Sequence, residues 1–262
     1  MKMPLLKVEG VSKYFQDPRS KNEFCVFSDL SLSVKEKEFV AVLGHSGCGK
    51  STLLNIIAGI EKSNGGVVFL DGRQTVKPGL DRMVVFQNFA LMPWLSVQGN
   101  IRLAVKAAYP EWDKAAINRR VEKYVEMVNL TEARNKKPAE LSGGMRQRVG
   151  LARAFSVNPR IMLLDEPFAQ IDALTRGVIQ QELVRMWEDT GITIFMVTHD
   201  VDEAILLSDR VLLMTPGPGA TLAEEITIPF SRPRTRDRLV EDPAFFKLRD
   251  RIVAFLGHRQ AA

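Results

Sequence analysis

The segment Gly44–Thr52, which reads GHSGCGKST, holds the residues best suited to bind a phosphate. It fits the pattern G-x-x-x-x-G-K-[ST] and follows a predicted strand, Glu38–Leu43. Its glycines let backbone N–H groups turn toward an anion, and a predicted helix adds the positive end of its dipole. Lys50 offers charge to the β- and γ-phosphates of a nucleotide, and Ser51 offers a hydroxyl to Mg²⁺. We expect phosphate contacts from Gly44, His45, Ser46, Gly47, Cys48, Gly49, Lys50, Ser51 and Thr52.

Two adjacent carboxylates end a second predicted strand, in the segment Ile161–Pro167 (IMLLDEP). Burying charge there is costly unless a cation or a polar ligand compensates. Asp165 fits as the partner of Mg²⁺, and Glu166 is placed to polarise the water that attacks a γ-phosphate. An acidic strand end that merely faces solvent is the alternative, and the neighbouring phosphate loop argues against it.

A third segment, Glu140–Arg148 (ELSGGMRQR), places Ser142, Gly143 and Gly144 where a helix should begin. Serine is a favoured N-cap, so an ordinary capped helix is one interpretation. Paired glycines are a poor start for a helix unless something approaches the backbone closely, and the helix dipole makes a second anion site. Two phosphate-binding ends in one chain are difficult to use in one nucleotide site and simple to use across a dimer.

Short strand-like runs and longer helical patterns must position these residues. The runs are rich in Val, Ile and Leu and mostly lack alternation, as in buried strands of a sheet covered on both faces. They are Glu38–Leu43, Val67–Leu70, Met83–Phe86, Ile161–Leu164, Ile192–Thr198 and Arg210–Met214. From Asn88 to Ser156 the pattern is helical. The sequence therefore predicts an α/β core interrupted by a helical insertion.

Composition excludes several classes of protein. The chain has 262 residues, 45% hydrophobic and 26% charged, so a collagen-like or largely disordered chain is excluded. Its net charge of +5 comes from scattered basic residues, which is no nucleic-acid signature. Its 2 cysteines are too few for a disulfide framework or a metal cage. No apolar run is long enough to span a membrane, and no signal peptide is visible, so we expect a cytosolic protein unless another chain holds it at a membrane.

The motifs occur together in the order and spacing of ABC-transporter ATPase subunits, which the chain resembles over nearly its whole length. The resemblance rests on Gly44–Thr52, Gln87 after a strand, LSGGM at Leu141–Met145, LLDEP at Leu163–Pro167, Asp172 and His199. It implies a P-loop (RecA-like) α/β core with an inserted helical subdomain, ATP and Mg²⁺ as cofactors, and hydrolysis coupled to translocation. The implied domains are a nucleotide-binding core at 1–87 and 157–230, a helical subdomain at 88–156, and a basic linker with a terminal helix at 231–262.

The resemblance also implies roles for single residues. Gln87 would ligate Mg²⁺, follow the γ-phosphate and pass its presence to membrane subunits. His199 would contact the γ-phosphate as a switch. Phe15 would stack on adenine, with Tyr14 as the alternative.

Other residues are implied to act across a dimer. Ser142, Gly143 and Gly144 would close on the ATP held by the other protomer, and Asp172 would link the two sites. Met145 stands where Gln is most common in this signature. Because Glu166 is intact, we expect ATP hydrolysis to be kept. The change at Met145 would affect the rate at which hydrolysis is coupled to transport.

Three stretches resemble the subfamily of small-anion importers: Asp81–Asn100, Arg153–Arg176 and Pro229–Leu256. The last is similar to the end of nitrate-importer ATPases, in a group that also serves bicarbonate, cyanate, sulfonate and taurine. This implies a short ATPase subunit at the cytoplasmic face of the bacterial inner membrane. Its partners would be transmembrane permease subunits, a periplasmic or lipid-anchored substrate-binding protein reached through them, and a second ATPase subunit, identical or a longer paralogue.

Three alternatives compete with a transport ATPase. A soluble ABC ATPase of DNA repair or translation usually has a coiled coil or a second cassette, for which 262 residues leave no room. A P-loop GTPase or kinase would need its own base-recognition motif. Asn135–Pro138 lacks the Asp that guanine recognition requires, and the LSGGM signature would be unexplained. A regulatory subunit that hydrolyses ATP weakly stays open.

Two surface questions also stay open in the sequence. Trp94 belongs either to the core or to a groove for a cytoplasmic permease helix, within Asn88–Leu95. The Arg-rich segment after Ser231 predicts a solvated linker before a helix docked on its own domain, with contact to a partner subunit as the alternative.

Overall fold

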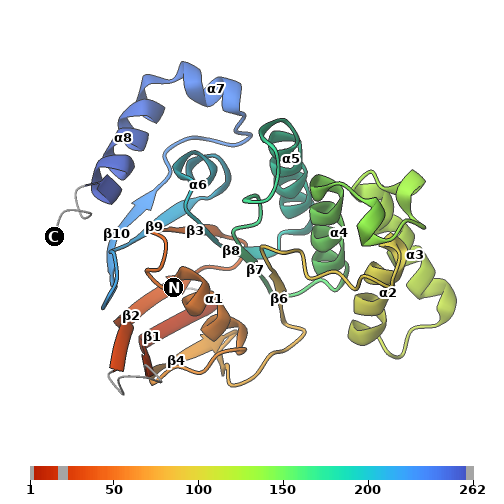
Figure 1. The fold of residues 1–262 in the computed structure, drawn as a ribbon, viewed down its shortest axis with the longest axis horizontal. Helices are drawn as coiled ribbons and strands as arrows, with labels where there is room; N and C mark the ends of the chain where they lie inside the picture. The colour runs from red at the N-terminus through yellow and green to blue at the C-terminus, as the bar shows by residue number, and fades with distance from the viewer. Residues whose placement is uncertain (1–2, 17–22, 258–262) are drawn as a thin grey trace. The chain divides into compact units, whose positions relative to one another are not determined.

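The computed structural model describes residues 3–16 and 23–257. The chain divides into two compact units. Unit 1 comprises 1–78 and 194–262, and unit 2 comprises 79–193. Figure 1 shows the elements of each.

Unit 1 contains an antiparallel sheet with the strand order β2-β1-β4-β5. Its strands are β1 (Leu6–Gln16), β2 (Glu23–Val34), β4 (Gly65–Leu70) and β5 (Arg73–Gln74). The expectation that Val67–Leu70 lies in a sheet covered on both faces was wrong. Along β4 buried and partly exposed residues alternate, as in a strand with one face on the core. The strands β1 and β2 were not predicted, because long mixed polar and apolar segments lack a buried strand's apolar run.

The second group of strands in unit 1 positions the phosphate loop. Its order is β10-β9-β3-β8, with β3 (Phe39–Leu43) parallel to both β8 (Thr193–Thr198) and β9 (Arg210–Met214). Every residue of β3 is buried, which explains its unbroken apolar sequence. The last strand is β10 (Leu222–Thr227), antiparallel to β9, and the helices are α1 (Lys50–Ala58) and α6 (Val201–Leu207).

The segment after Ser231 docks on unit 1. It forms α7 (Arg236–Glu241) and α8 (Pro243–Gly257), and α8 packs beside α6 in Figure 1. The expectation that the linker is solvated was wrong for two of its arginines. Arg232 pairs with Asp209 at 2.8 Å, and Arg234 donates to the carbonyl of Phe230 at 2.9 Å. Burial lowers the pKa of Arg234 to about 10.

Unit 2 carries the predicted helical insertion. Two parallel strands, β6 (Arg82–Val85) and β7 (Ile161–Asp165), flank it in the chain. The helices are α2 (Val97–Ala108), α3 (Lys114–Met127), α4 (Gly143–Ser156) and α5 (Ala173–Thr190), with 3-10 turns η1 (Thr131–Ala133) and η2 (Pro138–Glu140). The residues between β6 and α2 are irregular, although their sequence pattern is helical. In the described part of the chain, none of the helices is long and apolar enough to cross a membrane.

Candidate nucleotide-binding site

The phosphate loop lies in unit 1 between the buried strand β3 and the N-terminus of α1. Its two inner glycines, Gly47 and Gly49, have φ angles of 81° and 100°. At Gly49 a Cβ atom would also lie 2.5 Å from a methyl of Val26, so only glycine fits there. The sequence thus needs its glycines both for the turn and for the close approach to β2.

Lys50 is the charged centre of this loop, and its side chain is only 5% exposed. Its ammonium donates to the carbonyls of Gly44 at 2.8 Å and His45 at 2.9 Å. The loop carbonyls therefore compensate the charge of Lys50, which lies at the N-terminus of α1, the helix end that favours anions. Ser46, Gly47 and Ser51 are exposed on the same loop.

Cys48 fills the space beneath the loop. It is fully buried, and burial raises the pKa of its thiol, opposed by the nearby Lys50. A buried thiol with a raised pKa is unreactive, so packing explains the residue.

Phe15 stands at the end of β1 with 44% of its surface exposed. The ammonium of Lys13 lies 4.6 Å from the centre of its ring, and the same ammonium pairs with Glu61 at 2.6 Å. One face of the ring is therefore supported by a fixed cation. Tyr14, the alternative, is partly buried and its backbone N–H donates to Asn64.

His199 is exposed between β8 and α6 in unit 1. The following Asp200 caps α6, accepting from the backbone N–H of Glu203 at 3.1 Å. Thr198 donates to the Glu203 carboxylate at 2.9 Å. These bonds fix the backbone on both sides of His199.

The acidic pair lies in unit 2, where Asp165 ends β7. Both Asp165 and Glu166 are partly buried. Glu166 has a φ of 45°, a left-handed conformation that costs free energy in any residue with a side chain. Such strain persists where the surrounding structure enforces it, and it gathers at functional sites.

The signature segment forms the start of α4 in unit 2. Ser142 is the N-cap, and its hydroxyl accepts from the backbone N–H of Met145 at 3.3 Å. Gly144 is buried, and a Cβ there would lie 2.4 Å from the Thr175 methyl on α5. Both interpretations of the segment therefore have a structural basis: a capped helix and a close approach. The close partner of Gly144 is a neighbouring helix.

Asp172, proposed to link two sites, is the N-cap of α5. Its carboxylate accepts from the backbone N–H of Thr175 at 2.9 Å, and this bond lowers the pKa of Asp172. The side chain stays exposed and charged at neutral pH.

Gln87 is exposed two residues beyond the end of β6. The loop after it is held by residues that the sequence analysis missed. Arg153 of α4 donates to the carbonyls of Ala90 at 2.7 Å and Phe89 at 3.1 Å. The φ angles of both are positive, so the arginine stabilises an unusual turn. Arg153 lies in the last turn of α4 and is partly buried, and the sequence carried no signal of this contact.

The second missed residue is Asn100, which is fully buried. Its amide accepts from the backbone N–H of Met92 at 2.8 Å and donates to the carbonyl of Ser96 at 3.0 Å. The loop that it closes presents Trp94, which is 68% exposed. The alternative that Trp94 belongs to the core was wrong.

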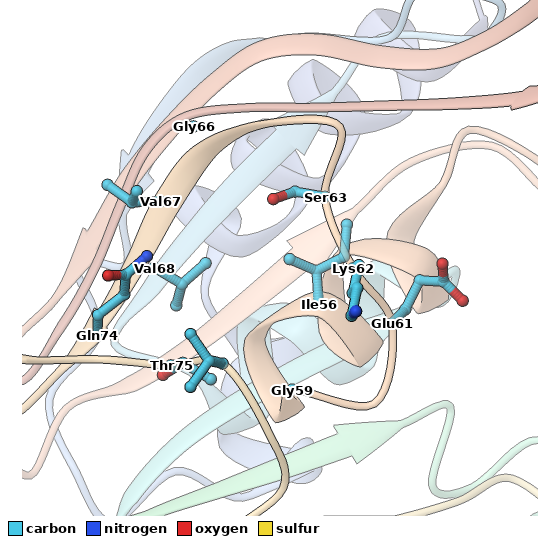
Figure 2. A pocket seen from close by; sticks show the side chains of 11 residues that line it. Ile56, Gly59, Glu61, Lys62, Ser63, Gly66, Val67, Val68, Gln74 and Thr75 are labelled. Atoms are coloured by element: carbon cyan, nitrogen blue, oxygen red, sulfur yellow. The ribbon is translucent and has the colours of Figure 1, made fainter.

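A pocket of unit 1 lies apart from the phosphate loop. Its volume is about 340 Å³. Figure 2 shows its lining, which comes from the end of α1, the turn that follows, β4, and the segment that begins at the end of β5. Its Glu61 is already paired with Lys13. Among the described residues, no cluster of His, Cys, Asp and Glu suits a metal ion by itself.

Comparisons with known proteins identify the class. The family model "ABC transporter" matches residues 27–169. The ATP-binding cassette MJ0796, in a dimeric post-hydrolysis state bound to ADP and Pi, aligns with a TM-score of 0.76 and 31% identity, over 86% of this chain and 100% of that chain. The chain therefore belongs to the ABC transporter family, and it is an ATP-binding ATPase subunit with the predicted α/β cassette fold.

Particular relatives are similar over nearly the full length. The nitrate import ATP-binding protein NrtD of Synechococcus elongatus is 49% identical, over 98% of this chain and 93% of its own. The bicarbonate transport ATP-binding protein CmpD of the same organism is 47% identical, over 98% and 92%. The nitrate import protein NrtC is 44% identical, over 98% of this chain and 39% of its own.

Proposed function

We propose that this chain is the ATP-hydrolysing subunit of an importer for a small inorganic anion, with nitrate as the first candidate. The 49% identity to a nitrate import protein over 98% of the chain carries this proposal. Bicarbonate is the second candidate, because the bicarbonate relative is 47% identical over the same share. Cyanate, sulfonates and taurine are the remaining candidate substrates.

The described residues support specific roles in ATP binding. The loop Gly44–Thr52 binds the phosphates, and the Lys50 ammonium offers its charge to the phosphate oxygens. Phe15 stacks on the adenine with the ring face that Lys13 leaves open. His199 contacts the γ-phosphate from its fixed turn. Lys50 is buried and Phe15 is exposed, as these two roles require.

Residues of unit 2 have their own roles in the proposal. Glu166 accepts a proton from the attacking water, and Gln87 follows the γ-phosphate. The signature residues Ser142, Gly143 and Gly144, together with Asp172, act on the nucleotide of a second protomer. An exposed helix N-terminus at Ser142 supports this role, because it offers dipole and N–H groups to an anion.

Magnesium fits the donors available. Ser51, Gln87 and Asp165 provide hydroxyl, amide and carboxylate oxygens, the ligands that Mg²⁺ prefers in proteins. The ion supplies charge neutralisation on the phosphates when bound. Ser51 is exposed and Asp165 is partly buried at a strand end.

The assembly follows from this role. The chain works at the cytoplasmic face of the membrane, bound to permease subunits that take substrate from a binding protein. It pairs with a second ATPase subunit, either a copy or a longer paralogue such as the NrtC type. We retain the domain division into a core at 1–87 and 157–230, a helical subdomain at 88–156, and a linker with terminal helix at 231–262.

The test is ATP hydrolysis by the chain reconstituted with its permease and binding protein. Nitrate, nitrite, bicarbonate, cyanate and sulfonates are added in turn. Stimulation by nitrate or nitrite alone is expected. Stimulation by bicarbonate alone would select the second candidate, and hydrolysis without response to any anion would favour a non-transport ATPase.

A further inference from the structure

The end of α8 contacts the phosphate loop. The imidazole Nε2 of His45 lies 2.5 Å from the carbonyl oxygen of Leu256, which is 211 residues away in the chain. A carbonyl oxygen only accepts, so Nε2 carries the proton and donates. The last carbonyls of a helix have no partner within the helix and lie at its negative end. The loop therefore supplies a donor that the helix end needs.

His45 is also held through its own backbone. Its carbonyl accepts from the Lys50 ammonium at 2.9 Å and from the Cys48 N–H at 3.3 Å. His45 thus contacts both the end of α8 and the ammonium of Lys50. The side chain of His45 contacts Leu256, and its backbone carbonyl contacts Lys50.

The helix that holds His45 is firmly seated on unit 1. On its inner face, Ile252 is fully buried and Phe245 is 4% exposed. Arg249 donates to Asp202 of α6 at 2.7 Å, and Arg251 pairs with Glu224 of β10. The anchoring helix α6 begins two residues after His199. Because α8 is fixed in this way, its last carbonyls offer the phosphate loop a stable contact.

We propose that α8 is a positioning element for the phosphate loop, acting from the Leu256 carbonyl through His45 on the cradle of Lys50. This inference rests on the proposed ATPase function. A loop already held in its binding conformation loses less conformational freedom when phosphate binds. Loss of the contact should therefore weaken ATP binding and leave the hydrolysis step nearly unchanged.

A proline at position 257 tests the contact without removing the helix. The residue before a proline is driven out of the helical conformation, so Gly257→Pro turns the Leu256 carbonyl away from His45. Gly257→Ala is the matched control, because a Cβ at this exposed position meets nothing within 4 Å. In Gly257→Pro we expect the KM for ATP to rise about 2- to 10-fold, as for one lost hydrogen bond, with kcat within about 2-fold.

Variants of His45 complete the test. His45→Ala should raise KM, whereas His45→Gln, whose amide also donates, should restore most of the loss. If His45 acts through α8, combining His45→Ala with Gly257→Pro raises KM no further than His45→Ala alone. Circular dichroism and thermal melting confirm that each variant is folded.

The outcomes separate this inference from the proposed function. A wild-type chain that neither binds nor hydrolyses ATP would remove the proposed function and this inference with it. Normal hydrolysis by the wild type, with equal KM values in Gly257→Pro and Gly257→Ala, would overturn the positioning role alone. Multiplied effects in the double variant would do the same.

Discussion

Two residues of the candidate site adopt arrangements that cost free energy locally. Glu166 keeps a left-handed backbone although it carries a side chain, and Lys50 is buried among carbonyls of its own loop. Both arrangements are unfavourable for a residue considered alone. Glu166 directly follows the strand β7, whereas Lys50 begins the helix α1 after the phosphate loop.

Glu166→Gln should lower the rate of ATP hydrolysis about 10²- to 10⁴-fold, the usual contribution of a general base. ATP affinity should be retained, because the amide keeps the shape of the side chain. Steady-state hydrolysis and equilibrium binding of ATP measure the two quantities. The exposed Glu188 on α5 provides the control Glu188→Gln. Hydrolysis at the wild-type rate would exclude Glu166 as the base.

At the scale of elements, α4 connects two parts of unit 2. Its first turn approaches α5 at Gly144, and Arg153, in its last turn, clamps the loop after Gln87. Burial lowers the pKa of Arg153, which is still charged at neutral pH. The signature helix α4 therefore holds the loop after Gln87 through the hydrogen bonds of Arg153.

Gly144→Ala should destabilise the chain by about 1–3 kcal/mol, because the added Cβ overlaps the Thr175 methyl. Gly177→Ala, on α5 with open space around its Cβ, should instead stabilise by about 0.4–1 kcal/mol. Urea unfolding of both variants measures the difference. Equal stabilities would show that α4 and α5 separate at little cost.

Arg153→Ala should accelerate amide hydrogen exchange in residues 88–96, because the carbonyls of Phe89 and Ala90 lose their donor. Exchange in α3 should not change. Arg119→Ala, at an exposed position of α3, is the control. The clamp is disproved by unaltered exchange in a folded Arg153→Ala protein, and mass spectrometry of peptides resolves the two regions.

In the proposed function, the whole molecule transmits nucleotide state to membrane subunits. The loop closed by Asn100 presents Trp94 at 68% exposure, beside the exposed Pro93. Large exposed aromatic side chains are enriched where proteins bind partners. This loop follows Gln87 in the chain, so the residue that would follow the γ-phosphate and the surface that would contact the permease belong to one segment.

Trp94→Ala should reduce stimulation of hydrolysis by the reconstituted permease at least 10-fold, since losing a central aromatic contact costs about 2 kcal/mol or more of binding. The rate of the chain alone should fall much less. Leu174→Ala, at a 90% exposed position of α5, is the control. Equal losses of basal and stimulated rates would place Trp94 outside the permease interface.

Sequence alone determined the motifs, the family and the order of buried strands and helices. This was possible because a phosphate loop needs particular glycines and a lysine in consecutive positions, and buried strands need unbroken apolar runs. Both requirements are local, so they are written in adjacent residues. The boundaries of β3, β7 and β9 accordingly agree with prediction within one residue.

Only the tertiary structure decided the rest. The pairing of β1 with β4, the clamp of Arg153 on the loop after Gln87 and the contact of α8 with His45 each join segments distant in the chain. The exposure of Trp94 likewise became known only from the folded chain. A side chain's partner in such a contact is set by packing, and its type alone does not reveal the partner. Arg232 and Arg234 were therefore expected to be solvated, whereas in the folded chain both are partly buried and donate to backbone carbonyls, and Arg232 also pairs with the Asp209 carboxylate.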